Sequence, residues 1–221
     1  MTSRVLVTGA NRGIGLALCQ YYKKQGNEVV AVCRNASDEL VELDVEIIDS
    51  VEVTCEQSVS KLAQILNGRK IDLLINNAGI LRGQSLNNLD YAAISEQFQV
   101  NAVAPIRLVK ALMDNLVDGS KIAMITSRMG SIEDNTSGGA YGYRMSKSAL
   151  NAAGKSLAID LKPKGIAVAL LHPGYVQTEM VNFGGDISAA VAAQRLAQRI
   201  EELSLQNSGT FWHSNGEVLP W

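Results

Sequence analysis

Short apolar runs alternate along this chain with longer stretches in which apolar residues recur at helical spacing. The runs are mostly aliphatic and are bounded by Gly, Asn, Pro or charged residues. This pattern is typical of strands buried on both faces of a parallel sheet. It predicts strands at 4–8, 28–33, 71–75, 122–125 and 166–172, a strand of open register within 45–53, and a short strand at 211–212.

The stretches between these runs have the spacing of amphipathic helices. The stretch 91–116 should be broken or bent near Pro105, because proline has no N–H to donate and its ring clashes with the preceding turn. Helices are predicted at 13–25, 56–66, 91–116 and about 188–203, with at most a short helix at 37–43. A further helix should follow the loop after Ser127, carry Tyr143 and Lys147, and end near 162.

The alternation of these elements indicates the fold. Strands that alternate with helices form repeated βαβ units with right-handed crossovers. No linker, repeat or low-complexity segment divides the chain. We therefore predict an α/β fold, a single Rossmann-type doubly wound parallel sheet with helices on both faces. One domain should extend over 1–221, with a short substrate-binding segment from about 175 to 221.

Composition and charge exclude several classes of function. The formal net charge is −2, and basic residues are scattered, so no partner of nucleic acid or anionic membrane is expected. No apolar stretch is long enough to span a bilayer, and the first strand begins too early for a signal peptide. Cys19, Cys33 and Cys55 contain no CxxC pair, which suits reduced thiols in the cytoplasm. His172 and His213 lack metal-ligand spacing, so no metal site is predicted.

A possible proton-transfer site follows the strand at 122–125. Ser127 stands directly after this strand, at the sheet edge where open α/β sheets bind ligands. Tyr143 and Lys147 are four residues apart, so they share one face of the following helix. A hydroxyl, a phenol and an ammonium at one point could exchange a proton with a substrate oxygen.

A glycine-rich loop, TGANRGIG, joins the first strand to the first helix. Its glycines, Gly9, Gly13 and Gly15, have the spacing GxxxGxG. Such residues allow the backbone to approach a pyrophosphate, and the helix that follows offers free N–H groups and the positive end of its dipole. The alternative is a turn that only connects strand to helix.

Together these motifs resemble the short-chain dehydrogenase/reductase family along almost the whole chain. The similar segments are TGANRGIG, NNAG at 76–79, Asn101 in FQVNAVAP, Ser127 in ITSRMG, Tyr143 and Lys147 in YRMSK, and HPGYVQTEM at 172–180. The segment after Ser127 and the final GEVLPW are similar to its C-factor-like and sniffer-like carbonyl reductases. The resemblance implies an oxidoreductase that interconverts a carbonyl and an alcohol by using a nicotinamide dinucleotide.

The resemblance also implies roles for individual residues. Tyr143 would be the general acid–base, Ser127 would hold the substrate oxygen, Lys147 would hold the cofactor ribose, and Asn101 would anchor a water. For the adenine contact, the family's Asp-Val pair is replaced by Glu52-Val53, or by Asp49 under another alignment. The cofactor contacts implied are Gly9, Asn11, Arg12, Gly13, Ile14, Gly15, Arg34, Glu52, Val53, Asn77, Ala78, Gly79, Tyr143, Lys147, Pro173, Gly174, Val176 and Thr178.

The charge of Lys147 is expected to lower the pKa of Tyr143. A free phenol has a pKa near 10, which is too high for a base at neutral pH. At about 4 Å and an effective dielectric constant of 20, a cation contributes about 4 kcal/mol, or roughly three pKa units. Tyr143 would then approach the working range of an acid–base catalyst.

The end of the second strand favours NADP(H), with NAD(H) still possible. Enzymes that use NAD place a carboxylate there for the ribose 2′-OH, whereas this chain has the neutral Cys33. Arg34 follows it, and Arg12 in the glycine loop should lie across the same pocket. Two guanidiniums without a carboxylate between them suit a 2′-phosphate.

Two rival functions remain at this point. A regulatory protein of the C-factor type could bind the dinucleotide without turnover, although it would not need the Tyr143–Lys147 pair. An epimerase or dehydratase would need a larger carboxyl-terminal region. The segment between Thr178 and Ser188 is too short for a long lid, so we expect an open pocket for small carbonyls. The resemblance also implies a homodimer or homotetramer.

Overall fold

A seven-stranded, wholly parallel sheet forms the centre of the molecule, in the order β3-β2-β1-β4-β5-β6-β9. The structure is a computed structural model, and it describes residues 2–221. The prediction of an α/β, Rossmann-type parallel sheet is confirmed. The strands are β1 (Arg4–Thr8), β2 (Glu28–Val32), β3 (Glu46–Ile48), β4 (Ile71–Asn76), β5 (Leu116–Ile125), β6 (Ala167–His172) and β9 (Phe211–His213).

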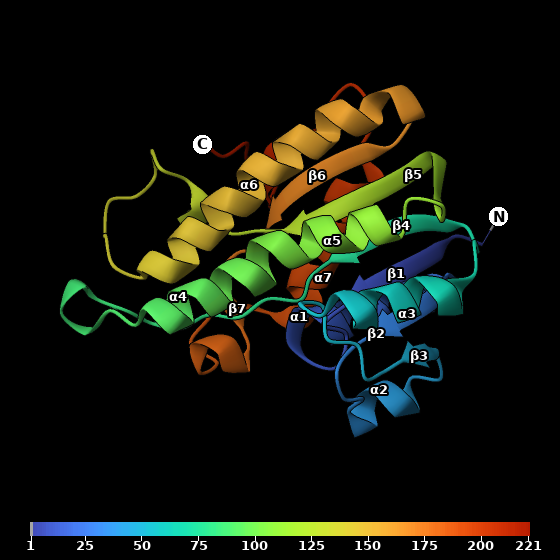
Figure 1. Cartoon of the computed structure of the whole chain (residues 1–221), viewed down its shortest axis with the longest axis horizontal. Coiled ribbons are helices and arrows are strands. Elements are labelled where there is room, and N and C mark those ends of the chain that lie inside the picture. Colours follow the sequence, from blue (N-terminus) through green and yellow to red (C-terminus); the bar gives the residue numbers. More distant parts are fainter. Residues whose placement is uncertain (1) are drawn as a thin grey trace.

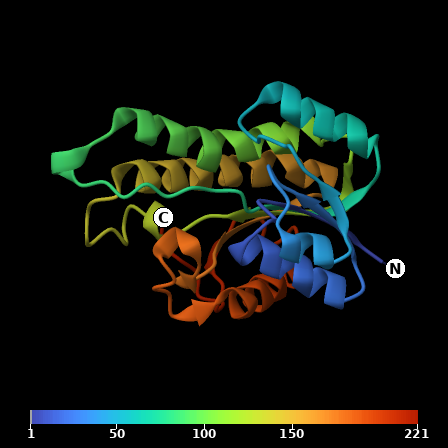
Figure 2. The same cartoon turned by 90° about the horizontal axis from the view of Figure 1, so that it is seen from below.

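Helices cover both faces of this sheet, as the edge-on view shows (Figure 2). One face packs against α1 (Gly13–Lys24), α2 (Asp38–Glu42) and α7 (Ala189–Glu201). The other face carries α3 (Glu56–Leu66), α5 (Ala104–Ala111) and α6 (Tyr141–Leu161). Each strand therefore contributes to two cores: in β1, Leu6 faces α3 and α5, whereas Val5 and Val7 face α1 and α7.

The long helical region before β5 departs from its prediction. The first part, α4 (Tyr91–Phe98), continues through a π-helical segment, Gln99–Val103, into α5. The bend therefore lies just before Pro105, and the wider turn brings Asn101 into the interior. The helix also ends earlier than predicted, at Ala111, because the chain at Leu116 already pairs with Ile71 in the sheet.

Short elements between the main helices and strands complete the fold (Figure 1). A small two-stranded sheet, β7 with β8, follows β6 and precedes α7. Its loop holds one of several single turns of 3₁₀ helix. These elements are η1 (Leu86–Asn88), η3 (Arg128–Gly130), η4 (Lys162–Lys164), β7 (Val176–Gln177), η5 (Glu179–Val181) and β8 (Ile187–Ser188).

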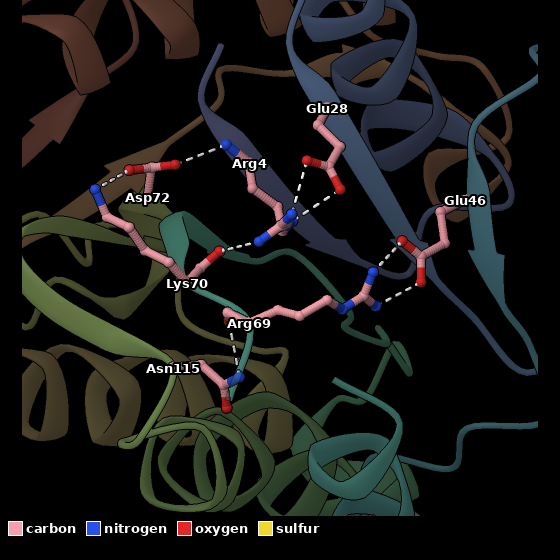
Figure 3. Close-up of polar contacts among 7 residues, drawn as sticks. All are labelled: Arg4, Glu28, Glu46, Arg69, Lys70, Asp72 and Asn115. Carbon is pink, nitrogen blue, oxygen red and sulfur yellow. Dashed lines mark hydrogen bonds and ion pairs between the residues drawn. The ribbon is translucent and has the colours of Figure 1, made fainter. Parts of the chain in front are cut away.

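Ion pairs tie the amino ends of the strands together (Figure 3). Arg4 at the start of β1 donates two hydrogen bonds to Glu28 at the start of β2, at 2.8 and 2.9 Å. Arg69 donates two to Glu46 at the start of β3, at 2.9 and 2.6 Å. Asp72 of β4 accepts a hydrogen bond from the backbone N–H of Arg4. The charged side chains at this edge are therefore paired with one another.

Within residues 2–221, no helix is both long enough and apolar enough to cross a membrane.

Candidate active site

A cavity of about 910 Å³ opens at the carboxyl edge of the sheet. It runs from the glycine loop after β1, past the ends of β2 and β4, to the loops after β5 and β6. Every residue predicted for the site lines this cavity, with the exception of Asn101 and of Asp49, the alternative candidate for the adenine contact. The topology thus brings together segments that are far apart in the sequence.

The glycine loop packs closely on the turn after β4. A Cβ on Gly9, whose φ is +64°, would lie 2.9 Å from Ala78 Cα, and one on Gly15 would lie 2.1 Å from Gly9 O. Asn77 Nδ2 donates to Thr8 O and Gly9 O at 2.9 and 3.2 Å. The loop is therefore held in a single path beside the cavity, where only glycine fits at these two positions.

The amino terminus of α1 faces this cavity through Gly13, Ile14 and Gly15. No side chain caps the helix, and its first turn contains no acidic residue. Its free N–H groups and dipole thus suit an anionic group such as a pyrophosphate.

Ser127, Tyr143 and Lys147 are all buried at the inner end of the cavity. Ser127 is the N-cap residue just before η3, and its Oγ accepts a hydrogen bond from Met129 N at 3.1 Å. α6 packs directly on this turn, since a Cβ on Gly130 would lie 2.8 Å from the Lys147 carbonyl carbon. The close contact between turn and helix sets the serine beside the phenol.

The pKa prediction for Tyr143 is wrong for this structure. Burial raises the pKa of Tyr143 to about 12, and the neighbouring Ser127 hydroxyl offsets only part of this effect. Lys147 Nζ lies 5.8 Å from the centre of the Tyr143 ring and donates to Ile125 O at 2.8 Å. Burial also lowers the pKa of Lys147 to about 8. For both groups, desolvation therefore has a larger effect on the pKa than the attraction between phenolate and ammonium that the sequence suggested.

Asn101 is buried away from the cavity and holds two segments together. Its Oδ1 accepts from Ile80 N at 2.8 Å, and its Nδ2 donates to Ile80 O and Ser146 Oγ at 2.8 and 3.0 Å. Its side chain therefore joins the turn after β4 to the helix that carries Lys147.

The two arginines lie at the cavity as predicted, but each has a carboxylate partner. Arg34 Nη1 is 3.6 Å from Glu52 Oε2, and Arg12 pairs with Glu179 of η5. Glu52 Oε1 also accepts from Thr54 N and Oγ1 at 3.1 and 2.9 Å. These carboxylates come from other loops and not from the end of β2, where Cys33 stands, so folding adds a partner to each guanidinium that the local sequence does not show.

Several residues that line the cavity were not predicted from the sequence. Some of them, such as Ile80, Leu81 and Tyr175, directly follow the NNAG and HPG motifs, and apolar residues in such loops were the available signal. Exposed side chains among them, Tyr175, Met180 and Phe183, surround the opening beside β7. Examples of these residues are Ile80, Leu81, His172, Tyr175, Met180 and Phe183.

A model of the short chain dehydrogenase family matches residues 3–186. The chain belongs to this family. As a short-chain dehydrogenase/reductase it is an oxidoreductase that acts on small molecules with a nicotinamide dinucleotide. The resemblance to this family is therefore confirmed.

Two similar proteins of this family differ in their described roles. A 1-hydroxy-2-glutathionyl-2-methyl-3-butene dehydrogenase of Rhodococcus sp. strain AD45 is 37% identical over 99% of this chain and 100% of its own length. The C-signal protein of Myxococcus xanthus is 42% identical over 68% of this chain and 93% of its own length. The resemblance to C-factor-like reductases is thus confirmed.

Solved structures of carbonyl reductases share the fold of this short-chain dehydrogenase/reductase over its whole length. An NADPH-bound carbonyl reductase from chicken fatty liver has a TM-score of 0.91 and 32% identity, covering 100% of this chain and 99% of its own. The carbonyl reductase Sniffer of D. melanogaster has a TM-score of 0.91 and 30% identity, covering 100% of both chains.

Proposed function

We propose that this enzyme is an NADPH-dependent carbonyl reductase in which Tyr143 exchanges the proton with the substrate oxygen. The observation that carries this proposal is the burial of Ser127, Tyr143 and Lys147 together at the end of a cavity that begins at the glycine loop. When bound, the nicotinamide supplies or accepts the hydride. The chain must then deliver one proton at one oxygen atom.

Tyr143 suits the role of acid in the reductive direction. With a pKa of about 12, its phenol remains protonated at neutral pH and can donate to a substrate carbonyl oxygen. The Ser127 hydroxyl would bind the same oxygen. Lys147 would bind the cofactor ribose, and its ammonium would stabilise the phenolate left after donation.

The proposed selectivity for NADPH rests on Arg12 and Arg34. Both guanidiniums line the cavity near the neutral Cys33. Their present carboxylate partners are more than 40% exposed, at 59% for Glu179 and 41% for Glu52, so these ion pairs contribute only about 0–1 kcal/mol. A 2′-phosphate carries nearly two charges and can displace them. The NADPH bound to the similar chicken reductase agrees with this preference.

We further propose that the substrate is uncharged and small. Two of the cations that line the cavity are already paired with carboxylates, since Arg82 lies 3.5 Å from Glu96 and Arg128 lies 3.1 Å from Glu217. The segment from β7 to just beyond η5 adds the apolar side chains of Val176, Met180 and Phe183 to the lining. The segment 175–221 would supply this part of the pocket within a single domain.

A panel of aldehydes, ketones and quinones, each with NADPH and with NADH, tests the proposal directly. We expect broad, weak acceptance of small carbonyls, with NADPH oxidised faster than NADH. One bulky substrate with a submicromolar KM, or equal rates with both cofactors, would contradict it. Tyr143→Phe is the control for proton transfer.

A second candidate function is regulatory, and the similarity to the Myxococcus C-signal protein supports it. In that case the chain would bind dinucleotide tightly but would turn over no member of the carbonyl panel. The buried phenol and ammonium favour the enzyme.

We also propose a homodimer or homotetramer. α4 and α6 expose large apolar side chains, with Tyr91 77%, Met145 53% and Ile159 64% exposed. Light scattering coupled to size exclusion at micromolar concentration would measure the assembly.

A further inference from the structure

A turn at residues 213–217 contacts two of the loops that border the candidate active site, the loop after β5 and the loop after β6. It follows β9 and is closed by its own hydrogen bonds: His213 N donates to Glu217 O at 2.8 Å, and Glu217 N donates to Asn215 Oδ1 at 3.0 Å. Gly216 N donates to His213 O at 2.9 Å. These bonds give the turn a defined shape of its own.

On one side the turn holds the loop after β6. Ser214, which is 1% exposed, donates from its backbone N to His172 O and from its Oγ to Pro173 O, both at 2.8 Å. The His213 and His172 rings meet edge to face, with centres 4.8 Å apart. Gly174 also approaches His213, because a Cβ there would lie 3.7 Å from its Cε1. The path of this loop along the cavity therefore depends on the turn.

On the other side the turn holds the residue that follows Ser127. Arg128 Nη2 donates to both Glu217 carboxylate oxygens, at 3.2 and 3.1 Å. Arg128 Nε also lies 2.8 Å from Asp134 Oδ2, although its N–H is not directed at that oxygen, so this contact is ionic. The guanidinium thus joins η3, the loop before α6 and the turn.

Ser127 is next in the chain to the residue that makes this connection. Ser127 and Arg128 are adjacent in a single turn of 3₁₀ helix, so a shift of the Arg128 backbone moves the serine as well. A displacement of about 1 Å in a group that positions a substrate can cost about a hundredfold in rate. An exposed ion pair that contributes little to stability can therefore matter for turnover.

We infer that Arg128 and Glu217 are positioning residues, and that the 213–217 turn aligns Ser127 with the loop after β6 for proton transfer. This inference rests on the proposed function, because it assumes that Ser127 binds the substrate oxygen. It assigns no substrate contact to Glu217. Loss of the Arg128–Glu217 ion pair should disturb alignment in the transition state and should change cofactor affinity little.

A double-mutant cycle on Arg128→Gln and Glu217→Gln tests the inference. Each single variant should lower kcat about fivefold to tenfold, leave the Kd for NADPH within about twofold, and shift Tm little. The double variant should be no slower than either single variant, because both remove the same connection. The matched control is the cycle on Arg69→Gln and Glu46→Gln, an ion pair of similar exposure at the amino edge, where kcat should not change.

Amide hydrogen exchange gives a readout that needs no turnover. In Glu217→Gln, the N–H groups of Met129 and Gly130, which bond to Ser127, should exchange at least tenfold faster than in the wild type. Unchanged exchange, or an unchanged kcat in an active enzyme, would overturn the inference. If the wild type reduces no carbonyl, the proposed function fails, while the exchange rates still decide whether the turn holds the loop.

Discussion

The two edges of the same parallel sheet differ in how their ionisable side chains are paired and buried. At the amino edge, acidic and basic side chains are partly exposed and paired, as in Arg4–Glu28, Arg69–Glu46 and Lys70–Asp72 (Figure 3). At the carboxyl edge, Tyr143 and Lys147 are buried, and no carboxylate among residues 2–221 pairs with the ammonium.

The electrostatic consequences differ accordingly. At the amino edge, burial tends to raise the pKa of Asp72, but Lys70 and Arg4 outweigh it and lower that pKa. At the carboxyl edge, burial dominates, raising the pKa of Tyr143 and lowering that of Lys147. Paired charges at one edge favour the folded state, whereas desolvated groups at the other cost stability and are retained where a reaction needs them.

The largest effect should come from removing the phenol at the carboxyl edge. Tyr143→Phe keeps the ring and its packing but has no proton to donate. We expect turnover to fall by about a hundredfold or more, within the range for a lost acid–base group, while NADPH affinity stays nearly constant. Steady-state kinetics and fluorescence titration measure the two quantities. Full turnover in the variant would show that another group transfers the proton.

The buried ammonium should make stability rise with pH. The pKa of Lys147 is about 8 in the folded protein against 10.5 for the free side chain. Between these values the unfolded chain binds more protons than the folded one, so the free energy of unfolding increases with pH. Relative to Lys147→Met, the wild type should gain about 2 kcal/mol between pH 8 and pH 10. Urea unfolding at several pH values measures this difference, and parallel curves for both proteins would refute it.

The arginines near Cys33 should have a smaller effect, on cofactor choice. Arg34→Ala and Arg12→Ala should each weaken NADPH binding about tenfold, because each removes one charge-assisted contact of about 1.5–3 kcal/mol. NADH binding should change little. Cys33→Asp combined with Arg34→Ala should reverse the preference. Calorimetry at moderate salt provides the comparison, and a wild type that binds NADH as tightly as NADPH would falsify the assignment.

The smallest effect should follow loss of charge at the amino edge. Glu46→Gln keeps the size of the side chain but removes its ion pair with Arg69, which is about one-third exposed. We expect a loss of about 0.5–1 kcal/mol in unfolding free energy and unchanged kcat. A marked fall in kcat, measured beside the stability, would show that the two edges are coupled.

The sequence alone indicated the fold and many of the residues that line the candidate site. Aliphatic runs between amphipathic stretches indicated the parallel sheet, because their periods are local properties of the chain. The spacing of Tyr143 and Lys147 and the position of Ser127 after a strand indicated a common site. These three residues line one cavity, together with the residues that the family resemblance implied, except Asn101 and the alternative adenine contact Asp49.

Only the tertiary structure decided what these groups experience. The carboxylates beside Arg12 and Arg34, the contact between Arg128 and Glu217, and the enclosure of Asn101 all join residues far apart in the chain. The pKa of Tyr143 depends on how much water the surrounding elements exclude, and a helical spacing of four residues cannot show that. Local periodicity specifies which atoms can meet, whereas packing between distant segments sets their charge, solvent access and alignment.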